Sequence, residues 1–133
     1  MQISATVITF NEEQHIKKCL DSLSDVADEI VVVDSFSTDQ TETICRSYEK
    51  VRFIKNEFQG YIEQKHIDIE HANYDWILSL DGDECLSEQL IEEIRHLKQD
   101  TTNQYQAYSM PRLNNYCGRW IYHGGWYPDR KIR

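Results

Sequence analysis

The stretch ISATVITF, residues 3–10, decides the fold. It is rich in Ile, Val and Thr, and its apolar character is nearly continuous. A short run of this kind is typical of a parallel strand that is buried on both faces. We therefore expect Ile3 to Phe10 to form the first strand of a sheet that is covered on both sides.

Three further short apolar runs, at residues 30–33, 51–54 and 76–80, predict further strands. The segments between the runs, and the segment after the last one, carry apolar residues at helical spacing. Alternation of strands with helices predicts an α/β fold with a mainly parallel sheet and helices on both faces. In such sheets ligands bind beyond the carboxyl ends of the strands, so the residues that follow these runs are candidates for a site.

Polar residues near the expected helix starts predict which side chains cap the helices. Asn11 and Gln14 form a capping-box pattern before the first helix. Ser37 or Thr38 is expected to cap the second helix, and Ser87 is expected to cap the fourth.

The third expected helix covers residues 61–71. Ile62, His66 and Ile69 fall on one side of it. Such spacing is typical of a helix that packs through that side.

Charge and composition exclude several classes of protein. The 133 residues carry a formal net charge of −9, which argues against non-specific nucleic-acid binding, because that depends on Lys and Arg neutralising phosphates. An acidic protein that handles a diphosphate needs a metal ion between itself and the ligand. No apolar run approaches the roughly 20 residues that span a bilayer, and the first residues do not resemble a signal peptide. We expect no nucleic-acid partner, no transmembrane segment, and a location in the cytoplasm or, through peripheral association, at the cytoplasmic face of a membrane.

Two carboxylates directly follow the run at 76–80, in the segment Asp81-Gly82-Asp83. Side chains two residues apart point to the same side of an extended chain, so both carboxylates can reach one ligand. Gly82 allows a tight turn or a close approach to that ligand. Mg²⁺ and Mn²⁺ prefer oxygen ligands and share them with substrate phosphates. The competing interpretation is an acidic turn before the helix that Ser87 caps, because Asp and Gly are common turn residues.

Polar motifs also follow the first and second runs. Thr9-Phe10-Asn11-Glu12 closes the first run, and DSFSTDQT, residues 34–41, closes the second. Together with Asp81-Gly82-Asp83, and in this order, they resemble the family 2 glycosyltransferases of the GT-A fold, whose segments read T-x-N-E, D-x-x-S-x-D-x-T and D-x-D. Further segments are similar to a bacterial branch of that family, the lipopolysaccharide-core glycosyltransferases; they are residues 60–61, 64–65, 75–81 and 123–129.

The resemblance implies a Rossmann-like GT-A fold for nucleotide-diphospho-sugars and a role for each matching residue. Asp34 would hydrogen-bond the nucleobase, Asp81 would lie near the ribose and the metal, and Asp83 would coordinate Mg²⁺ or Mn²⁺. Many relatives have a second acidic residue where this chain has Ser35, so the identity of the base stays open. The full set of donor-site residues implied is Thr9, Phe10, Asn11, Glu12, Asp34, Ser35, Lys65, Asp81 and Gly82.

The activity implied is inverting transfer of a sugar from a nucleotide-sugar donor, a UDP-hexose, to a saccharide or lipid-linked acceptor. The setting would be the synthesis of cell-envelope polysaccharide or lipopolysaccharide. A divalent cation would stabilise the departing nucleoside diphosphate, and a separate carboxylate would take the proton from the acceptor hydroxyl. In relatives this base lies well after the D-x-D segment, and no residue of this chain is assigned to it. The candidates for the acceptor side are His123, Gly124, Trp126 and Asp129.

The character of the sequence changes after residue 100. Residues 1–100 are expected to form the nucleotide-sugar-binding α/β part, which ends with the helix after the D-x-D segment. Residues 101–133 are rich in Tyr and Trp, which pack well on sugar rings, and would begin the acceptor side of the same domain. Family members run to about twice this length, and no Gly, Pro or polar tail closes the chain at residues 131–133, so we expect a truncated domain.

Three other interpretations stay open on the sequence alone. A nucleotidyltransferase would share the sheet and the carboxylate pair, but it opens with a glycine-rich basic loop where this chain has Asn11-Glu12-Glu13. A non-catalytic nucleotide-binding module fits a chain without the second half of the family's domain. A response-regulator-like domain would need an Asp and a Lys after later strands, and both are absent there.

Overall fold

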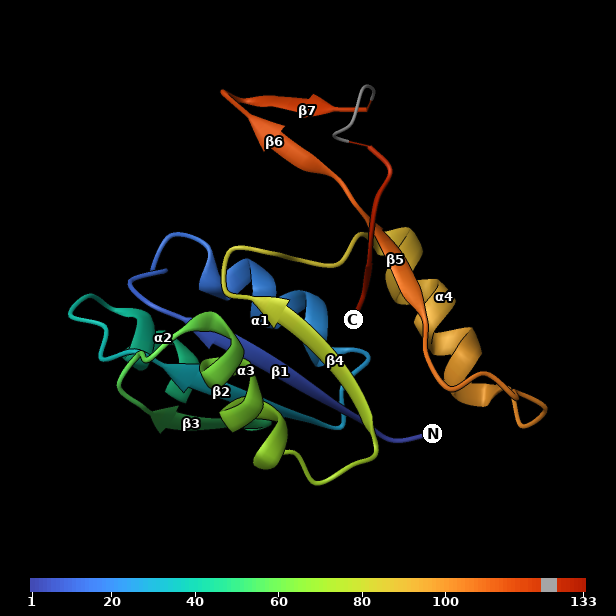
Figure 1. The fold of residues 1–133 in the computed structure, drawn as a ribbon, viewed down its shortest axis with the longest axis horizontal. Helices are drawn as coiled ribbons and strands as arrows, with labels where there is room; N and C mark the ends of the chain where they lie inside the picture. Colours follow the sequence, from blue (N-terminus) through green and yellow to red (C-terminus); the bar gives the residue numbers. More distant parts are fainter. Residues whose placement is uncertain (123–126) are drawn as a thin grey trace. The chain divides into compact units, whose positions relative to one another are not determined.

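The computed structural model describes residues 1–122 and 127–133, which form two compact units, Met1–Thr101 and Thr102–Arg133. Strands and helices alternate through the first unit, as the sequence predicts (Figure 1). In chain order they are β1 (Ile3–Thr9), α1 (Ile16–Ser24), β2 (Glu29–Asp34), α2 (Thr41–Arg46), β3 (Val51–Lys55), α3 (Tyr61–Glu70), β4 (Trp76–Asp81) and α4 (Glu88–Gln99).

The four strands of this unit form one parallel sheet in the order β3-β2-β1-β4. All seven residues of β1 are buried, which agrees with its central place and its continuous apolar character. In the register of the sheet, Thr9 lies opposite Asp34 and Ile8 lies opposite Asp81. The three polar motifs of the sequence therefore meet at one edge, where β1, β2 and β4 end.

The helices cover both faces of the sheet. β1, β2 and β3 follow one another in one direction across the sheet, whereas the chain returns past β1 to reach β4. Right-handed crossovers then place α1 and α2 on one face and α3 on the other (Figure 1). α4 lies with α1, because Lys98 of α4 donates to the carbonyl oxygen of Val26 at 2.8 Å and the Leu86 backbone N–H donates to Ser22 Oγ at 3.0 Å.

The apolar core is built from the central strands β1 and β2, which are buried on both faces, and from the buried side of α1. Burial of each of these aliphatic side chains contributes about 1.5–3 kcal/mol relative to exposure. The largest fully buried members are Ile16, Leu20, Leu23, Val26, Ile30, Val31, Val32, Val33 and Val7.

Two of the three predicted helix caps are wrong. α1 begins at Ile16 and α2 at Thr41, and neither has a side-chain cap. Asn11 instead accepts a hydrogen bond from the Thr38 backbone N–H at 2.8 Å, and Ser37 Oγ accepts one from the Asn11 backbone N–H at 2.8 Å. These residues join the loop after β1 to the loop after β2, a contact between distant segments that local capping patterns do not reveal. Ser87 does cap α4, since its Oγ accepts from the backbone N–H of Leu90 at 3.2 Å.

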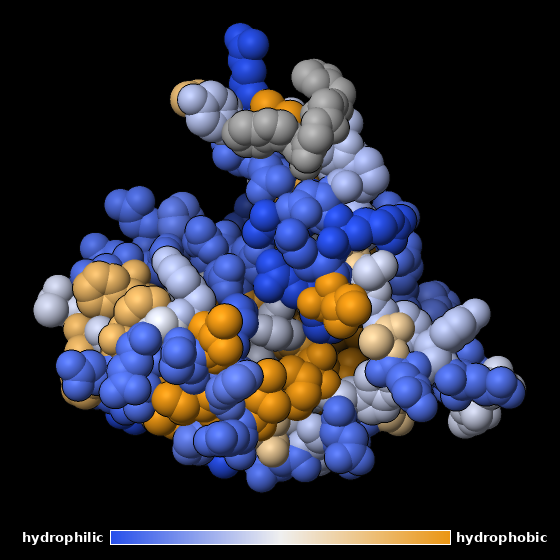
Figure 2. Space-filling view, in the orientation of Figure 1, coloured by the Kyte–Doolittle hydropathy of each residue, from blue (hydrophilic) through white to orange (hydrophobic). Residues whose placement is uncertain are grey.

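The side of α3 that packs on the sheet is polar, which contradicts the pattern expected from its apolar residues. Ile62 and Ile69 are exposed, whereas Gln64 and Asp68 are buried. Figure 2 shows apolar side chains on the surface where α3 and β4 lie. The reason lies in the strands that α3 covers: their hydroxyl groups suit polar neighbours, since Gln64 donates to Ser35 Oγ and Lys65 donates to Ser79 Oγ.

The second unit consists of two short antiparallel pairs. β5 (Ser109–Arg112) pairs with β8 (Asp129–Ile132), and β6 (Asn114–Tyr116) pairs with β7 (Arg119–Ile121). The Cys117-Gly118 turn has positive φ at both residues, 49° and 79°, as a two-residue hairpin turn of type I′ requires. Among the residues that the structure describes, no helix is long and apolar enough to cross a membrane.

Candidate functional site

A cavity of about 480 Å³ opens at the edge where β1, β2 and β4 end. That is where a parallel sheet places a ligand. Eleven residues line it: Ile8, Thr9, Phe10, Glu12, Ser35, Phe58, Tyr61, Gln64, Asp81, Gly82 and Asp83.

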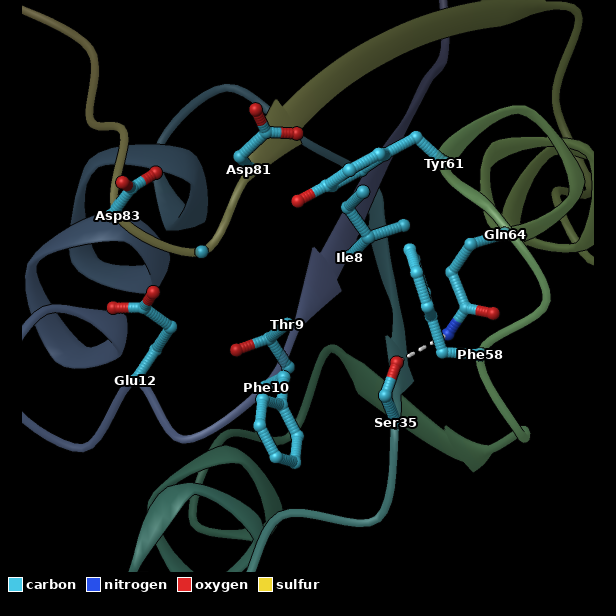
Figure 3. A pocket seen from close by; sticks show the side chains of 11 residues that line it. Ile8, Thr9, Phe10, Glu12, Ser35, Phe58, Tyr61, Gln64, Asp81 and Asp83 are labelled. Carbon is cyan, nitrogen blue, oxygen red and sulfur yellow. Dashed lines mark hydrogen bonds between the residues drawn. The ribbon is translucent and has the colours of Figure 1, made fainter.

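The two sides of the cavity differ in chemistry. Figure 3 shows Glu12 and Asp83 on one side and Phe58 and Gln64 on the other. The Phe58 and Tyr61 rings meet edge to face, with centroids 5.1 Å apart. One side therefore suits a cation with its anionic ligand, and the other suits a flat ring.

Most of the donor-site residues expected from the sequence lie on this cavity, but three do not. Asn11 joins the loops beneath it. Asp34 is fully buried, and its carboxylate accepts hydrogen bonds from the backbone N–H and the hydroxyl of Ser37. Lys65 forms an ion pair with Asp81 and is not one of the lining residues. The lining residues that carried no expected role are Ile8, Phe58, Tyr61 and Gln64; of these, Tyr61 and Gln64 belong to segments that resemble the lipopolysaccharide-core branch.

Lys65 offsets the charge of one carboxylate. Its ammonium Nζ lies 2.9 Å from Asp81 Oδ1 as an ion pair, and it donates a hydrogen bond of 3.0 Å to Ser79 Oγ. Asp83 is exposed, and no ion pair of it with a lysine or arginine is seen among residues 1–122 and 127–133. Asp83 is thus the carboxylate of the pair with more negative charge to offer a ligand.

The space around residue 82 leaves no room for a side chain. A Cβ atom at this position would lie 2.7 Å from Thr9 Oγ1 and 3.1 Å from Thr9 Cβ. The Gly82 backbone N–H also donates to the carbonyl oxygen of Ile8 at 2.9 Å. The turn that carries Asp81 and Asp83 is therefore pressed against the end of β1, and only glycine fits there without displacement.

The acidic side of the cavity fits a divalent cation held jointly with a ligand. Burial raises the pKa of Glu12, and the nearby negative charge of Asp83 raises it further. Within residues 1–122 and 127–133, no three acidic, histidine or cysteine side chains converge closely enough to hold a metal alone. Mg²⁺ in particular is held by one or two carboxylates together with substrate phosphates.

Asp68 is a buried acid behind the cavity. It is fully buried on α3, and neither carboxylate oxygen accepts a well-directed hydrogen bond from another described residue, although the Thr6 hydroxyl is near. Burial raises the pKa of Asp68 to about 6, while the positive charge of Lys65 lowers it and the negative charge of Asp81 raises it. The carboxyl group therefore changes charge close to neutral pH.

Of the four residues expected on the acceptor side, the structure describes only Asp129. His123, Gly124 and Trp126 lie outside the described residues. Asp129 belongs to the second unit, where hydrogen bonds from Lys131 and Arg112 hold its pKa below the usual range. A carboxylate paired in this way is a weak proton acceptor at neutral pH.

Curated relatives of the chain are glycosyltransferases. An uncharacterized glycosyltransferase of Rickettsia bellii is 37% identical over 113 residues, which cover 84% of this chain and 38% of that protein. The lipopolysaccharide core biosynthesis glycosyltransferase LpsC of Rhizobium meliloti is 38% identical over 101 residues, which cover 73% of this chain and 37% of that protein. The chain thus spans about two fifths of the length of these relatives.

Solved structures with the same arrangement of strands and helices are also sugar transferases. Residues 1-349 of S. aureus TarS superpose with a TM-score of 0.63 at 26% identity, covering 74% of this chain and 32% of that TarS chain. Glucosyl-3-phosphoglycerate synthase of Mycobacterium tuberculosis, solved with Mn²⁺, UDP and glucosyl-3-phosphoglycerate, gives 0.54 at 26% identity, with 61% and 33% covered. The mannosyltransferase PcManGT of Pyrobaculum calidifontis, solved with GDP-Man and Mn²⁺, gives 0.59 at 25% identity, with 76% and 33% covered.

These likenesses agree with the parallel sheet, the polar strand ends and the cavity they enclose. The fold of the first unit is that of the GT-A transferases. The sequence model of the family "Glycosyl transferase family 2" matches residues 4–129, and the chain therefore belongs to glycosyl transferase family 2.

Proposed function

We propose that the chain forms the donor-binding part of a metal-dependent glycosyltransferase that uses a nucleotide-sugar. The observation that carries the proposal is a cavity with two unlike sides, where Asp81 and Asp83 face Phe58 and Tyr61. A nucleotide diphosphate has the matching polarity, since its base is flat and aromatic and its phosphates are anionic. The acidic side needs a cation before it can accept those phosphates.

Asp83, assisted by Asp81, would hold a divalent cation, Mg²⁺ or Mn²⁺, together with phosphate oxygens of the donor. When bound, the cation supplies Lewis-acid stabilisation for the departing nucleoside diphosphate. The chain's own residues do the positioning. Lys65 fixes Asp81, and Gly82 keeps the turn against Thr9. The Mn²⁺ in the glucosyl-3-phosphoglycerate synthase and PcManGT structures supports this part of the proposal.

The donor we propose is a UDP-hexose, and the acceptor is a saccharide or a lipid-linked saccharide in the assembly of cell-envelope polysaccharide or lipopolysaccharide. The likeness to LpsC supports the acceptor class, and UDP in the synthase structure supports the nucleotide. Inversion at the sugar carbon is an expectation from the family resemblance, and no general base is assigned. A location in the cytoplasm, or at the cytoplasmic face of a membrane, also stays a prediction.

A second candidate is a nucleotide-binding module without catalysis. One observation favours it. The described residues form the proposed donor cavity, whereas Asp129, the described candidate for the acceptor side, forms ion pairs with Arg112 and Lys131 in the second unit. The two candidates share the donor site. A measurement of sugar transfer, with donor and acceptor supplied to the chain, distinguishes the two candidate functions.

Electron paramagnetic resonance of Mn²⁺ tests the shared donor site. Free Mn²⁺ gives a six-line signal that is lost when the ion is held asymmetrically. We expect the chain to remove this signal when UDP is present and to remove much less of it alone, because the metal needs phosphate oxygens as ligands. Equal amounts of free Mn²⁺ in UDP solutions with and without the chain would contradict the proposal.

A further inference from the structure

Charge is divided unevenly between the two units of the chain. The second unit, Thr102–Arg133, contains five of the 14 Lys and Arg residues but only one of the 23 Asp and Glu residues, which is Asp129. Its formal charge is therefore +4, whereas the first unit, Met1–Thr101, carries −13 of the chain's net −9. Such an asymmetry indicates that the basic part of a chain meets an anionic partner of its own.

The tip of the β6–β7 hairpin presents one cation and two aromatic rings. Tyr116 lies opposite Arg119 across the Cys117-Gly118 turn, and Trp120 follows Arg119 (Figure 1). All three side chains are exposed, Tyr116 to 60% and Trp120 to 53%. Because successive residues of a strand point to opposite faces, Tyr116 and Arg119 project from one face and Trp120 from the other. A hairpin that enters a surface tip first can use both faces.

The β5–β8 pair presents a second cation beside an aliphatic side chain. Arg130 and Ile132 are two residues apart on β8 and therefore share a face. Their partners across the pair, Pro111 and Ser109, lie on the same face, and all four residues are exposed, Ile132 to 75%. Asp129, the one acid of the unit, alternates to the other face. This face of the pair is thus cationic and apolar, with no carboxylate on it.

The two exposed arginines are available to an external anion. Asp129 forms its ion pairs with Arg112, at 2.6 Å between Oδ2 and Nη2, and with Lys131, at 3.2 Å between Oδ1 and Nζ. Among residues 1–122 and 127–133, neither Arg119 nor Arg130 forms an ion pair. No carboxylate of the described chain therefore offsets their charge at close range.

We propose that the hairpin tip (Tyr116, Arg119 and Trp120) and the exposed face of β8 (Arg130 and Ile132) dock the chain on an anionic lipid bilayer. Tyr and Trp rings favour the headgroup level of a bilayer, and aliphatic side chains gain at the boundary with the acyl chains. Each Lys or Arg near an anionic surface tightens binding by about fivefold. The inference names the surface and the lipid chemistry, and it does not rest on the donor cavity.

A bilayer fits this surface better than a nucleic acid does. A single-stranded nucleic acid is also anionic and stacks its bases on aromatic rings, but Ile132 has no ring for a base to stack on. A long polyanion that extends past the second unit would also meet the negative charge of the first. A bilayer repels that charge only within the screening length of about 8 Å at physiological salt.

The test is flotation of the whole chain with lipid vesicles, and the readout is the lipid concentration at which half of the chain is bound. One set of vesicles is phosphatidylcholine alone, and the other contains about three parts phosphatidylglycerol to seven of phosphatidylcholine, which makes it anionic. We expect binding to the anionic vesicles to be at least about tenfold tighter. The difference should shrink when salt is raised from about 0.1 M to about 1 M, which shortens the screening length from about 10 Å to about 3 Å.

Single variants locate the docking surface. Arg119→Gln and Arg130→Gln should each weaken binding to the anionic vesicles by about fivefold, and Trp120→Ala should weaken it by at least as much, because a large ring is withdrawn from the interface. Lys18→Gln is the matched control, since it removes the same charge from an exposed lysine of α1 in the first unit and should bind as the wild type does. Equal circular dichroism spectra establish that the variants fold alike.

The outcomes separate this inference from the proposed function. Equal binding to the two kinds of vesicle, or none to either, overturns the inference. A loss in Lys18→Gln as large as that in Arg119→Gln also overturns it, because net charge would then be the cause. Binding of a single-stranded oligonucleotide in place of the vesicles would make the surface a nucleic-acid site. Titration of UDP with Mn²⁺ is read separately, so the donor site stands or fails on its own result.

Discussion

Gly82→Ala is expected to lower the affinity for UDP with Mn²⁺ by at least about tenfold, or roughly 1.4 kcal/mol. The added Cβ would lie 2.7 Å from Thr9 Oγ1, and Thr9 is itself buried at the end of the central strand β1. The strand cannot yield easily, so the turn that carries Asp81 and Asp83 must move. Overpacking of this kind also costs about 1–3 kcal/mol of stability, which chemical denaturation measures alongside calorimetry.

A double variant shows whether the contact with Thr9 is the cause. Thr9→Ala removes the nearest atom, so Gly82→Ala should cost less stability and less affinity in that background than in the wild type. The difference between the two backgrounds is a coupling energy, which contacting residues show and distant ones do not. If Gly82→Ala has the same free energy of unfolding and the same affinity for UDP as the wild type, the contact of the turn with Thr9 is not tight.

Asp68→Asn is expected to stabilise the protein above neutral pH. The raised pKa of Asp68, about 6 in the folded chain, means that the folded state prefers the neutral carboxyl group. Above pH 6 the folded protein carries the buried charge, which costs about 3 kcal/mol of unfolding free energy on the scale of 1.36 kcal/mol per pKa unit. This cost fades as the pH falls from about 6 to the ordinary value near 4, where the unfolded chain is protonated as well.

Urea denaturation at pH 8 and at pH 4.5 measures this effect. The gain from Asp68→Asn should be larger at pH 8 by about 1–2 kcal/mol, with an unchanged slope against urea. Comparison between the two pH values removes the cost of burying the new amide, which is the same at both. Asp75→Asn, at an exposed aspartate before β4, is the control and should show no such difference. A gain of equal size at the two pH values would mean that Asp68 is not the titrating group.

The sequence predicts the strands and the edge where their polar ends meet, because the causes of both are local. A strand buried on both faces must be apolar along its length, so residues 3–10 could be identified without knowing their partners. Parallel strands end at one edge, so Thr9 and Asp81 could be expected to meet there. The register of β1 with its two neighbours confirms that arrangement.

The parts that could not be predicted depend on contacts between distant segments. Asn11 and Ser37 look like helix caps, but they join two loops that are adjacent only once β1 and β2 have paired. Helical spacing favoured Ile62 and Ile69 as the packed side of α3, because such spacing counts apolar residues. A buried Gln64 is recognisable only when its partners Asn56 and Ser35 are known.

The measurement that tests the account most directly is calorimetric titration of UDP into the chain with and without Mn²⁺, beside Asp83→Ala. We predict that Mn²⁺ tightens UDP binding by at least about tenfold and that Asp83→Ala removes this gain, because Asp83 is an exposed carboxylate that lines the cavity and has no cationic partner in the described part of the chain. Asp75→Ala, which removes an exposed aspartate away from the cavity, should bind as the wild type does. UDP binding of equal strength with and without Mn²⁺, or a full effect of Mn²⁺ in Asp83→Ala, would contradict a metal-assisted donor site in this cavity.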